Sequence, residues 1–386
     1  MRIVLVLLTC LTTVVTQAQT WQQLDDLPGP ARDDAASFFW GGSVFVGTGR
    51  AVDFSLTTDW YRFDDFNEWS QISSLPASGR QYCTAFADEQ YGYLFGGIDA
   101  NGPLNELWRY DPFTDQWEQR ASLPGPGRYA SVALFDRYIV TGMMADGAPT
   151  NECWEYNAEQ DSWTQRATMP GAPRHRAAEN YGVVLGGADA SFQALTDGYA
   201  YDPTNDTWSQ APDLPAALYG ADATEGVFVG GASSSTDYSS ATWILDGAAW
   251  STTIAPDFPG GVRRGGVISR SGMADIIVIY YGTGVDLEQR HNDWWTFIYM
   301  DVRVGENRPE SFRVLPNPAT DLVRVDIPPL RTSPMLVLRD AVGREVHRGQ
   351  APASGWFSIA HLPPATYFMS IETSDIISIA RPLVIH

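Results

Sequence analysis

Tryptophan recurs along this chain at nearly constant intervals. Successive members of a set of six are separated by 48, 48, 46, 45 and 42 residues. A period in this range is typical of repeat proteins, in which each repeat is one structural unit that buries its apolar face against its neighbours. The fold must therefore be interpreted repeat by repeat. The six tryptophans are Trp21, Trp69, Trp117, Trp163, Trp208 and Trp250.

Each repeat is expected to hold four short strands. In the second repeat, apolar alternation and turn signals predict strands over 82–87, 91–95, 106–111 and 116–120. The content of 35 glycines and 25 prolines suits short strands joined by tight turns. Four antiparallel strands in a repeat of this length are typical of one blade of a β-propeller.

A fixed order of short motifs recurs within the repeats. In the second repeat, the glycine pair Gly96-Gly97 precedes the turn Tyr110-Asp111-Pro112, which is followed by Trp117, Leu123-Pro124 and Arg128. This order resembles the Kelch repeat. Six copies imply an all-β, six-bladed Kelch propeller over residues 19–301. The glycine motifs end at Gly49, Gly97, Gly142, Gly187, Gly231 and Gly284.

The two ends of the repeat region predict how the ring closes. Residues 21–24 supply a fourth strand with no preceding three, whereas residues 264–301 supply three strands with no following fourth. The N-terminal strand is therefore expected to complete the last blade and to remove an exposed sheet edge. We predict that Trp21 packs against Trp294 or Trp295.

The fifth and sixth repeats depart from the motif order. In the fifth, Ala217-Leu218-Tyr219 follows Leu214-Pro215 where other repeats have an arginine. The sixth lacks a tryptophan of its own after its third strand. These two blades are expected to be less regular than the second, third and fourth.

The charge balance excludes several functions. The formal net charge is −21, and all 25 basic residues are arginines. A basic surface for nucleic acid is therefore not expected. The absence of lysine from the sequence excludes Schiff-base chemistry and amine nucleophiles.

The N-terminus has the layout of a secretory signal peptide over residues 1–18. Arg2 precedes an apolar core over 3–15, and Ala18 is the expected cleavage site. A lipoprotein signal at Cys10 is the alternative. No apolar run reaches the roughly 20 residues of a membrane helix. We expect export through the periplasm to a secreted or cell-surface location, without a transmembrane segment.

Two cysteines, Cys83 and Cys153, lie beyond the signal peptide. They fall in different repeats, and their spacing implies no particular pairing. A disulfide and two separate buried thiols are both open.

The tail beyond a linker at 302–311 has a different character. Residues 312–386 contain alternating segments that predict a small β-sandwich. The tail is similar to the C-terminal sorting domains of the type IX secretion system of Bacteroidota, although Ala365 replaces a usual glycine. The resemblance implies that the outer-membrane translocon of that system is a partner; an ordinary accessory sandwich is the alternative. The matching residues include Pro316, Asn317, Pro318, Gly343, Tyr367 and Arg381.

Arginines recur in the blade-to-blade loops, and one acid recurs in each loop after a glycine motif. Antiparallel strands place both loop classes on one face of the propeller. Guanidinium groups around a central mouth would bind a carboxylate, a sulfate or an acidic sugar, with a centre near 174–176, Tyr82 and Tyr129. Alternatively, the arginines satisfy loop carbonyls and neighbouring acids. The candidate ligand-binding residues are Arg32, Arg80, Arg128, Arg174, His175, Arg176 and Arg263.

Enzymatic interpretations find little support in the motifs. Copper-radical oxidases share the repeat but need two histidine ligands, and His175 and His291 are far apart in the sequence. Six-bladed sialic acid mutarotases use arginine with a carboxylate for acid–base work, and Glu179 and Glu225 beside the arginine face are candidate bases. No zinc, calcium or phosphate-loop motif is present, so no catalytic residue, metal or cofactor is assigned.

The leading hypothesis is a secreted or cell-surface binding and interaction protein. Its expected ligand is a glycan or a protein, and its expected export route is the type IX system. An extracellular carbohydrate-active enzyme, such as a mutarotase-like isomerase, is the alternative. A carboxylate that meets two arginines at the central mouth would favour the enzyme.

Overall fold

The structure is a computed structural model. The predicted signal peptide, the predicted linker, Pro316, Asn317, Pro318 and Gly343 lie outside the residues that it describes, so the predictions for them remain predictions. The described residues are 20–64, 66–247, 249–273, 276–300, 313–315, 322–326, 335–339, 345–350, 356–360, 362–372 and 381–385.

Contacts divide the chain into two compact units. Among the described residues, one unit comprises those up to Ser271 together with Val278–Tyr299, and the other comprises those of 272–277 together with those from Met300 onward. The described parts of both consist of strands, turns and loops. They include no helix long and apolar enough to span a membrane.

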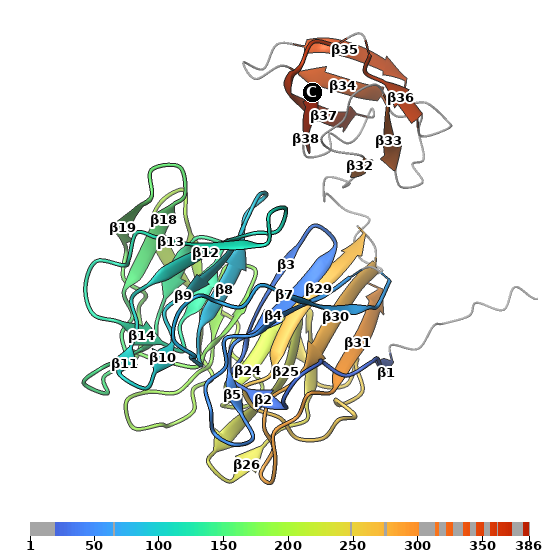
Figure 1. Cartoon of the computed structure of the whole chain (residues 1–386). Coiled ribbons are helices and arrows are strands. Elements are labelled where there is room, and N and C mark those ends of the chain that lie inside the picture. The colour runs from blue at the N-terminus through green and yellow to red at the C-terminus, as the bar shows by residue number, and fades with distance from the viewer. Residues whose placement is uncertain are drawn as a thin grey trace, which may run out of the picture. The chain divides into compact units, whose positions relative to one another are not determined.

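Six antiparallel sheets, each with a main path of four strands, form the blades of a β-propeller in the first unit (Figure 1). The first strands of neighbouring blades contact one another, which places them around the central axis. Blade 1 contains β3 (Ala36–Trp40), β4 (Ser43–Gly47), β6 (Trp60–Phe63) and β7 (Trp69–Ile72); blade 2 contains β8 (Thr84–Ala87), β9 (Gly92–Phe95), β12 (Leu107–Asp111) and β13 (Gln116–Arg120); blade 3 contains β15 (Val132–Leu134), β16 (Tyr138–Val140), β18 (Cys153–Asn157) and β19 (Ser162–Arg166).

The other three blades follow the same plan and complete the six-bladed fold that the repeats predict. Blades 5 and 6, whose motifs depart from the repeat, are both present, and β26 in the loop of blade 5 pairs with β25. Blade 4 contains β20 (Ala178–Asn180), β21 (Val183–Leu185), β22 (Gly198–Asp202) and β23 (Thr207–Ala211); blade 5 contains β24 (Tyr219–Thr224), β25 (Val227–Ser234), β26 (Asp237–Tyr238), β27 (Thr242–Asp246) and β28 (Ala249–Ser251); blade 6 contains β29 (Val267–Met273), β30 (Ile276–Gly282), β31 (Trp294–Met300) and β1 (Trp21–Gln23).

The predicted closure by the N-terminal strand is confirmed. β1 pairs antiparallel with β31, and this register places Trp21 opposite Phe297. The predicted partner of Trp21 is wrong, because its ring packs 5.0 Å from Phe297 and 5.1 Å from Phe258. Trp294 instead packs against Trp69 of blade 1, at 5.3 Å between ring centroids.

Short strands pair the blade-to-blade loops with the loops between second and third strands, so both kinds of loop lie on one face. The segment before each first strand pairs with the loop between the second and third strands of the same blade, which supports the predicted common face. We call this the mouth face. The short strands are β2 (Arg32–Asp33) with β5 (Arg50–Ala51), β14 (Arg128–Tyr129) with β17 (Met143–Met144), and the hairpin of β10 (Ile98–Asp99) with β11 (Gly102–Pro103).

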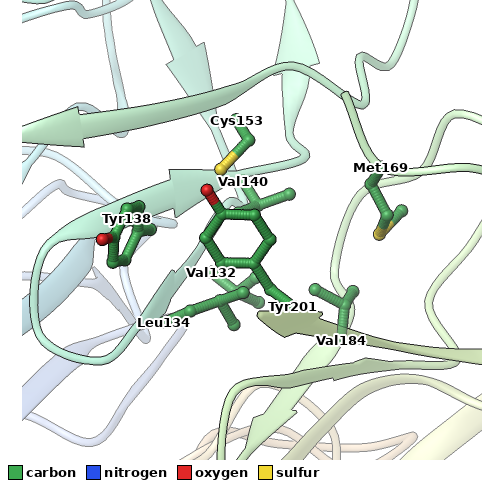
Figure 2. Packing of buried hydrophobic residues seen from close by; sticks show 8 residues of the cluster. All are labelled: Val132, Leu134, Tyr138, Val140, Cys153, Met169, Val184 and Tyr201. Atoms are coloured by element: carbon green, nitrogen blue, oxygen red, sulfur yellow. The ribbon is translucent and has the colours of Figure 1, made fainter. Parts of the chain in front are cut away.

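Apolar side chains fill the space between neighbouring blades. Figure 2 shows Val140 and Cys153 of blade 3 against Val184 and Tyr201 of blade 4. Cys83 and Cys153 are both free thiols, and burial raises the pKa of each to about 12. Both cysteines therefore act as small apolar side chains.

The second unit contains two sheets whose side chains share one apolar cluster. Val323 comes from one sheet, and Leu336, Met369 and Leu383 come from the other. The Tyr367 hydroxyl donates to the carbonyl of Pro363 at 3.0 Å. The sheets are β32 (Arg313–Leu315), β33 (Leu322–Asp326) and β36 (Trp356–Ser358), and β35 (Glu345–Gln350), β34 (Met335–Arg339), β37 (Ala365–Glu372) and β38 (Arg381–Ile385).

Five of the six recurring tryptophans, which we call the tryptophan ladder, each join their blade to the preceding one by a hydrogen bond. The indole N–H donates to a backbone carbonyl of the segment that follows the preceding blade's fourth strand. Trp250 in the irregular fifth blade makes no such bond within the described part of the chain. The bonds are Trp21 to Pro256 at 3.3 Å, Trp69 to Asp25 at 2.9 Å, Trp117 to Ser73 at 2.9 Å, Trp163 to Ala121 at 2.7 Å and Trp208 to Ala167 at 2.8 Å.

Removal of one such indole N–H should destabilise the propeller. We expect Trp163→Phe to lower the free energy of unfolding by about 1–2 kcal/mol more than Trp250→Phe, because both lose ring volume but only the first loses an inter-blade hydrogen bond. Denaturant unfolding followed by circular dichroism measures both values. Equal losses in the two variants would contradict this role for the ladder.

Candidate ligand-binding site

A closed circuit of backbone hydrogen bonds surrounds the axis at the mouth face. One residue from each blade donates its N–H to the carbonyl of the equivalent residue in the preceding blade, at 2.8–3.0 Å. All six have positive φ values between 52° and 61°. The circuit brings the side chains of blades 1, 2 and 4 to one place on the axis. Its members are Asp34, Tyr82, Ala130, Arg176, Gly220 and Gly265.

The five arginines of the blade-to-blade loops lie just outside this circuit and are 0% exposed. Each one pairs with the acidic residue directly before the third strand of its own blade. A buried charge is costly unless it is paired, so these partners give the arginines the structural role that was the alternative to ligand binding. The pairs are Arg32–Asp59 at 2.6 Å, Arg80–Glu106 at 2.9 Å, Arg128–Glu152 at 2.7 Å, Arg174–Asp197 at 2.8 Å and Arg263–Asp293 at 2.9 Å.

Blade 5 shows that the two members of this pair belong together. Leu218 takes the place of the arginine, and Ala241 takes the place of the acid before β27. The backbone bond of that position remains, because the N–H of Gly187 in blade 4 donates to the carbonyl of Leu218 at 2.9 Å. The side-chain pair thus reinforces a loop that the backbone already anchors.

Four side chains from blades 1, 2, 4 and 6 meet at the axis, and we call them the axial cluster: Asp34, Tyr82, Arg176 and Arg264. The Tyr82 hydroxyl accepts from Arg176 Nη2 at 2.9 Å and from Arg264 Nη1 at 3.4 Å. Asp34 Oδ1 lies 3.5 Å from Arg264 Nη1. The cluster therefore combines two cations, one carboxyl group and one phenol.

Arg176 differs from the loop arginines because it has no carboxylate partner. No carboxylate oxygen of a described residue lies within 4.0 Å of its guanidinium. Its Nε atom is buried without a hydrogen-bond acceptor, as are those of Arg128 and Arg263. The guanidinium lies 4.6 Å from the Tyr82 ring and 5.5 Å from the Phe192 ring. Arg176 is thus a fixed, partly buried cation that no carboxylate of the described residues contacts directly.

His175 is buried beside Arg176 and is held neutral. Burial, followed by the charge of Arg176, lowers the pKa of His175 to about 4. Its Nδ1 atom lies 3.1 Å from Arg176 Nη1 and accepts that hydrogen bond, since a guanidinium can only donate. His175 therefore positions Arg176 and adds no positive charge.

Asp34 is the one buried carboxyl group of the axial cluster. Burial, followed by repulsion from Asp33, raises the pKa of Asp34 to about 7, against the opposing charges of Arg264 and Arg176. A carboxyl group with this pKa can exchange a proton near neutral pH. It also neutralises its arginine neighbours incompletely.

Further charged and aromatic groups flank the cluster in the mouth loops. Asp33 pairs with Arg290 and lies 3.7 Å from Arg264 Nη2. The Arg290 guanidinium lies 4.9 Å from the ring of Phe54. Tyr238 accepts a hydrogen bond from Arg264 Nε at 3.3 Å. The sequence does not single out these residues, because the residue type at each of their positions differs from blade to blade.

The candidate bases Glu179 and Glu225 do not lie beside the arginine face, and that prediction is wrong. Glu225 follows the end of β24, on the turn opposite the mouth, and pairs with Arg270. Glu179 Oε1 accepts from the N–H of Gly182 in the equivalent turn of blade 4, at 2.8 Å. A six-residue strand is about 20 Å long, and it separates the two ends of β24.

The acids that follow the glycine motifs stabilise the turns of their loops. Asp99, for example, accepts from the N–H groups of Asn101 and Gly102, at 2.7 and 3.1 Å. These bonds stabilise the hairpin turn between β10 and β11. Within the described ranges, no three histidine, cysteine or acidic side chains form a group that could hold a metal ion.

The contrast between Arg174 and Arg176 is testable through stability. We expect Arg174→Gln to lower the free energy of unfolding by about 2–4 kcal/mol, because the Asp197 carboxylate and three backbone carbonyls lose their partner. Arg176→Gln should cost less than about 1 kcal/mol, because it removes an uncompensated cation. Equal losses in thermal and denaturant unfolding would show that Arg176 is as structural as Arg174.

Comparison with known proteins agrees with this architecture. The domain described as "KLHDC2/KLHL20/DRC7 Kelch-repeats domain" matches residues 5–184. The solved structure of YjhT is similar with a TM-score of 0.62 at 15% sequence identity, over 72% of this chain and 98% of that one. At this identity the likeness concerns the fold alone. No curated protein matches the sequence significantly. The chain thus contains a Kelch-repeat domain folded as a six-bladed propeller.

Proposed function

We propose that this Kelch-repeat propeller is a secreted or cell-surface binding protein whose ligand is an acidic glycan held at the axial cluster. The observation that carries the proposal is that no carboxylate of the described residues contacts the Arg176 guanidinium directly. Every loop arginine has a carboxylate oxygen within 2.9 Å, whereas Arg176 has none within 4.0 Å in the described part of the chain. A ligand carboxylate would supply that missing partner through charge-assisted hydrogen bonds.

The net charge of −21 does not prevent an anion from binding in direct contact with the arginines of the axial cluster. Charges separated by more than about 8 Å are largely screened at physiological ionic strength. Arg176 and Arg264 act directly on a bound anion, and Tyr82 fixes both guanidinium groups. Acids on distant blades influence mainly the rate of encounter.

A mutarotase-like isomerase is the second candidate, and the environment of Asp34 favours it. Its carboxyl group is buried, has a pKa near 7 and lies beside the cationic Arg264. Such a group could move a proton during sugar ring opening. Asp34 would then be the acid–base residue, with Arg176 as the site for a substrate carboxylate.

Binding of acidic oligosaccharides to the purified chain tests the first candidate. We expect acidic glycans on a glycan array to bind and neutral ones of the same length to stay silent. Arg176→Gln should weaken binding at least tenfold, because a charge-assisted hydrogen bond contributes about 1.5–3 kcal/mol. Arg109→Gln, on β12 in blade 2, is the matched control and should leave the affinity unchanged.

Two other results would redirect the assignment. Silence with all glycans, together with Arg176-dependent capture of a protein, would replace the glycan by a protein partner. Nuclear magnetic resonance can measure the interconversion of the anomers of an acidic sugar. Catalysed interconversion that the Asp34→Asn variant loses would favour the isomerase.

We infer that the tail serves export by the type IX secretion system. The support is the predicted signal peptide and the sorting-domain resemblance of the tail. Two of its motif residues lie on paired strands, since Tyr367 is opposite Leu383 and Arg381 is opposite Met369. A folded β-unit would present both strands to a translocon as one surface.

Export is testable by comparing the full chain with a chain that ends at residue 311. In a Bacteroidota host with a functional type IX system, we expect the full chain outside the cell and the shortened chain in the periplasm. A host with a disabled translocon should retain both. Release of the shortened chain at the same level as the full chain would show that the tail is an accessory domain.

A further inference from the structure

Two phenylalanines, in blades 1 and 4, occupy a loop position that in blade 3 is a glycine. Both lie in the loop between the second and third strands. The backbone N–H of each, Phe54 in blade 1 and Phe192 in blade 4, donates to the carbonyl of the residue three positions before it, at 2.9 and 3.0 Å. Gly147 of blade 3 makes the same bond at 3.1 Å. The φ values are 68°, 58° and 76°, respectively. The turn therefore requires the left-handed conformation, which glycine adopts without strain.

A bulky side chain in this conformation is unusual and destabilises the fold, so it is expected only where packing or function favours it. Burial does not retain these two side chains, because Phe54 is 62% and Phe192 is 51% exposed. Open space surrounds the equivalent Gly147, where an added Cβ atom would meet nothing within 4 Å. The phenylalanines thus combine backbone strain with exposure of apolar surface to water.

Both phenylalanines stack on arginines of the mouth face. The Phe54 ring lies 4.7 Å from the Arg50 guanidinium and 4.9 Å from that of Arg290. The Phe192 ring lies 5.5 Å from the guanidinium of Arg176 and 4.9 Å from the His175 ring. Each Phe–Arg unit presents an exposed apolar ring next to a cation. Gly147 provides no such ring in blade 3.

The two Phe–Arg units lie on opposite sides of the mouth. In a closed ring of six blades, blades 1 and 4 face each other across the axis. The axial cluster lies between them, with Arg176 shared by the cluster and the Phe192 unit. A ligand that contacts both units must therefore extend across the mouth.

We propose that the two Phe–Arg units are separate subsites for an extended acidic polysaccharide. This inference rests on the proposed function and deepens it. The flat C–H face of a sugar ring covers the exposed phenylalanine and is removed from water. The ring's carboxylate pairs with Arg176 beside Phe192 or with Arg50 beside Phe54. Repeated acidic sugars supply both groups at each subsite. An acidic peptide lacks the rigid apolar face that the phenylalanines offer.

A length series of oligogalacturonates tests the two-subsite arrangement with the full chain. We expect affinity to rise at least tenfold from the monomer to an oligomer that spans the mouth, because the second contact becomes intramolecular. Phe192→Gly should weaken monomer and oligomer alike. Phe54→Gly should weaken the oligomer about tenfold and leave the monomer unchanged.

Thermal unfolding separates binding from packing. We expect Phe54→Gly and Phe192→Gly to keep or raise the Tm, because glycine relieves the strained conformation. Gly147→Ala is the matched control and should lower the Tm, since its Cβ meets no atom and adds strain alone.

The results that would overturn the inference are distinct from those that would overturn the proposed function. Monomer binding that needs Arg176 but does not strengthen with length rejects the second subsite only. A lowered Tm with unchanged affinity in both phenylalanine variants assigns the rings to packing. Equal binding of polyglutamate rejects the polysaccharide. Absence of binding by every acidic glycan rejects the proposed function as well.

Discussion

The propeller depends on the closed circuit of backbone hydrogen bonds around its axis. Each peptide group of the circuit has its partner in a neighbouring blade, and a buried peptide group left unpaired would cost about 1–3 kcal/mol. Each blade supplies one donor and one acceptor, so the circuit is complete only when all six blades are present. The same circuit fixes the backbone positions of the axial side chains, because Asp34, Tyr82 and Arg176 are members of it and Arg264 precedes the member Gly265. The fold thereby positions the candidate site.

Repetition made the scaffold predictable from the sequence. The tryptophans and glycine pairs gave six blades, and the unequal ends of the repeat region gave the closure by β1. The partner of Trp21 was mispredicted, because a motif locates a strand but not the register that places Phe297 opposite it. An acid precedes the third strand in each blade that has a loop arginine. In blade 5 both residues are replaced, by Leu218 and Ala241, and this joint replacement could have predicted the ion pairs.

The candidate site was less predictable because its contacts join residues far apart in the chain. Hydrogen bonds and ion pairs of the axial cluster span 94, 182 and 230 residues. Arg174 and Arg176 look alike in sequence, yet one has a buried ion pair and the other has no carboxylate partner in the described structure. Periodicity identifies what every blade shares, whereas binding chemistry is expected where blades differ.

The closing strand also determines when folding can finish. Trp21 pairs with Phe297, so the first propeller residues synthesised must wait for the last ones. Until blade 6 is complete, β31 presents an unpaired edge of the kind that promotes misassembly. Ring closure is therefore a non-local and late event. A chain synthesised from its N-terminus therefore holds an open ring until β31 has been made, and the closing pair of strands joins the two ends of the propeller last.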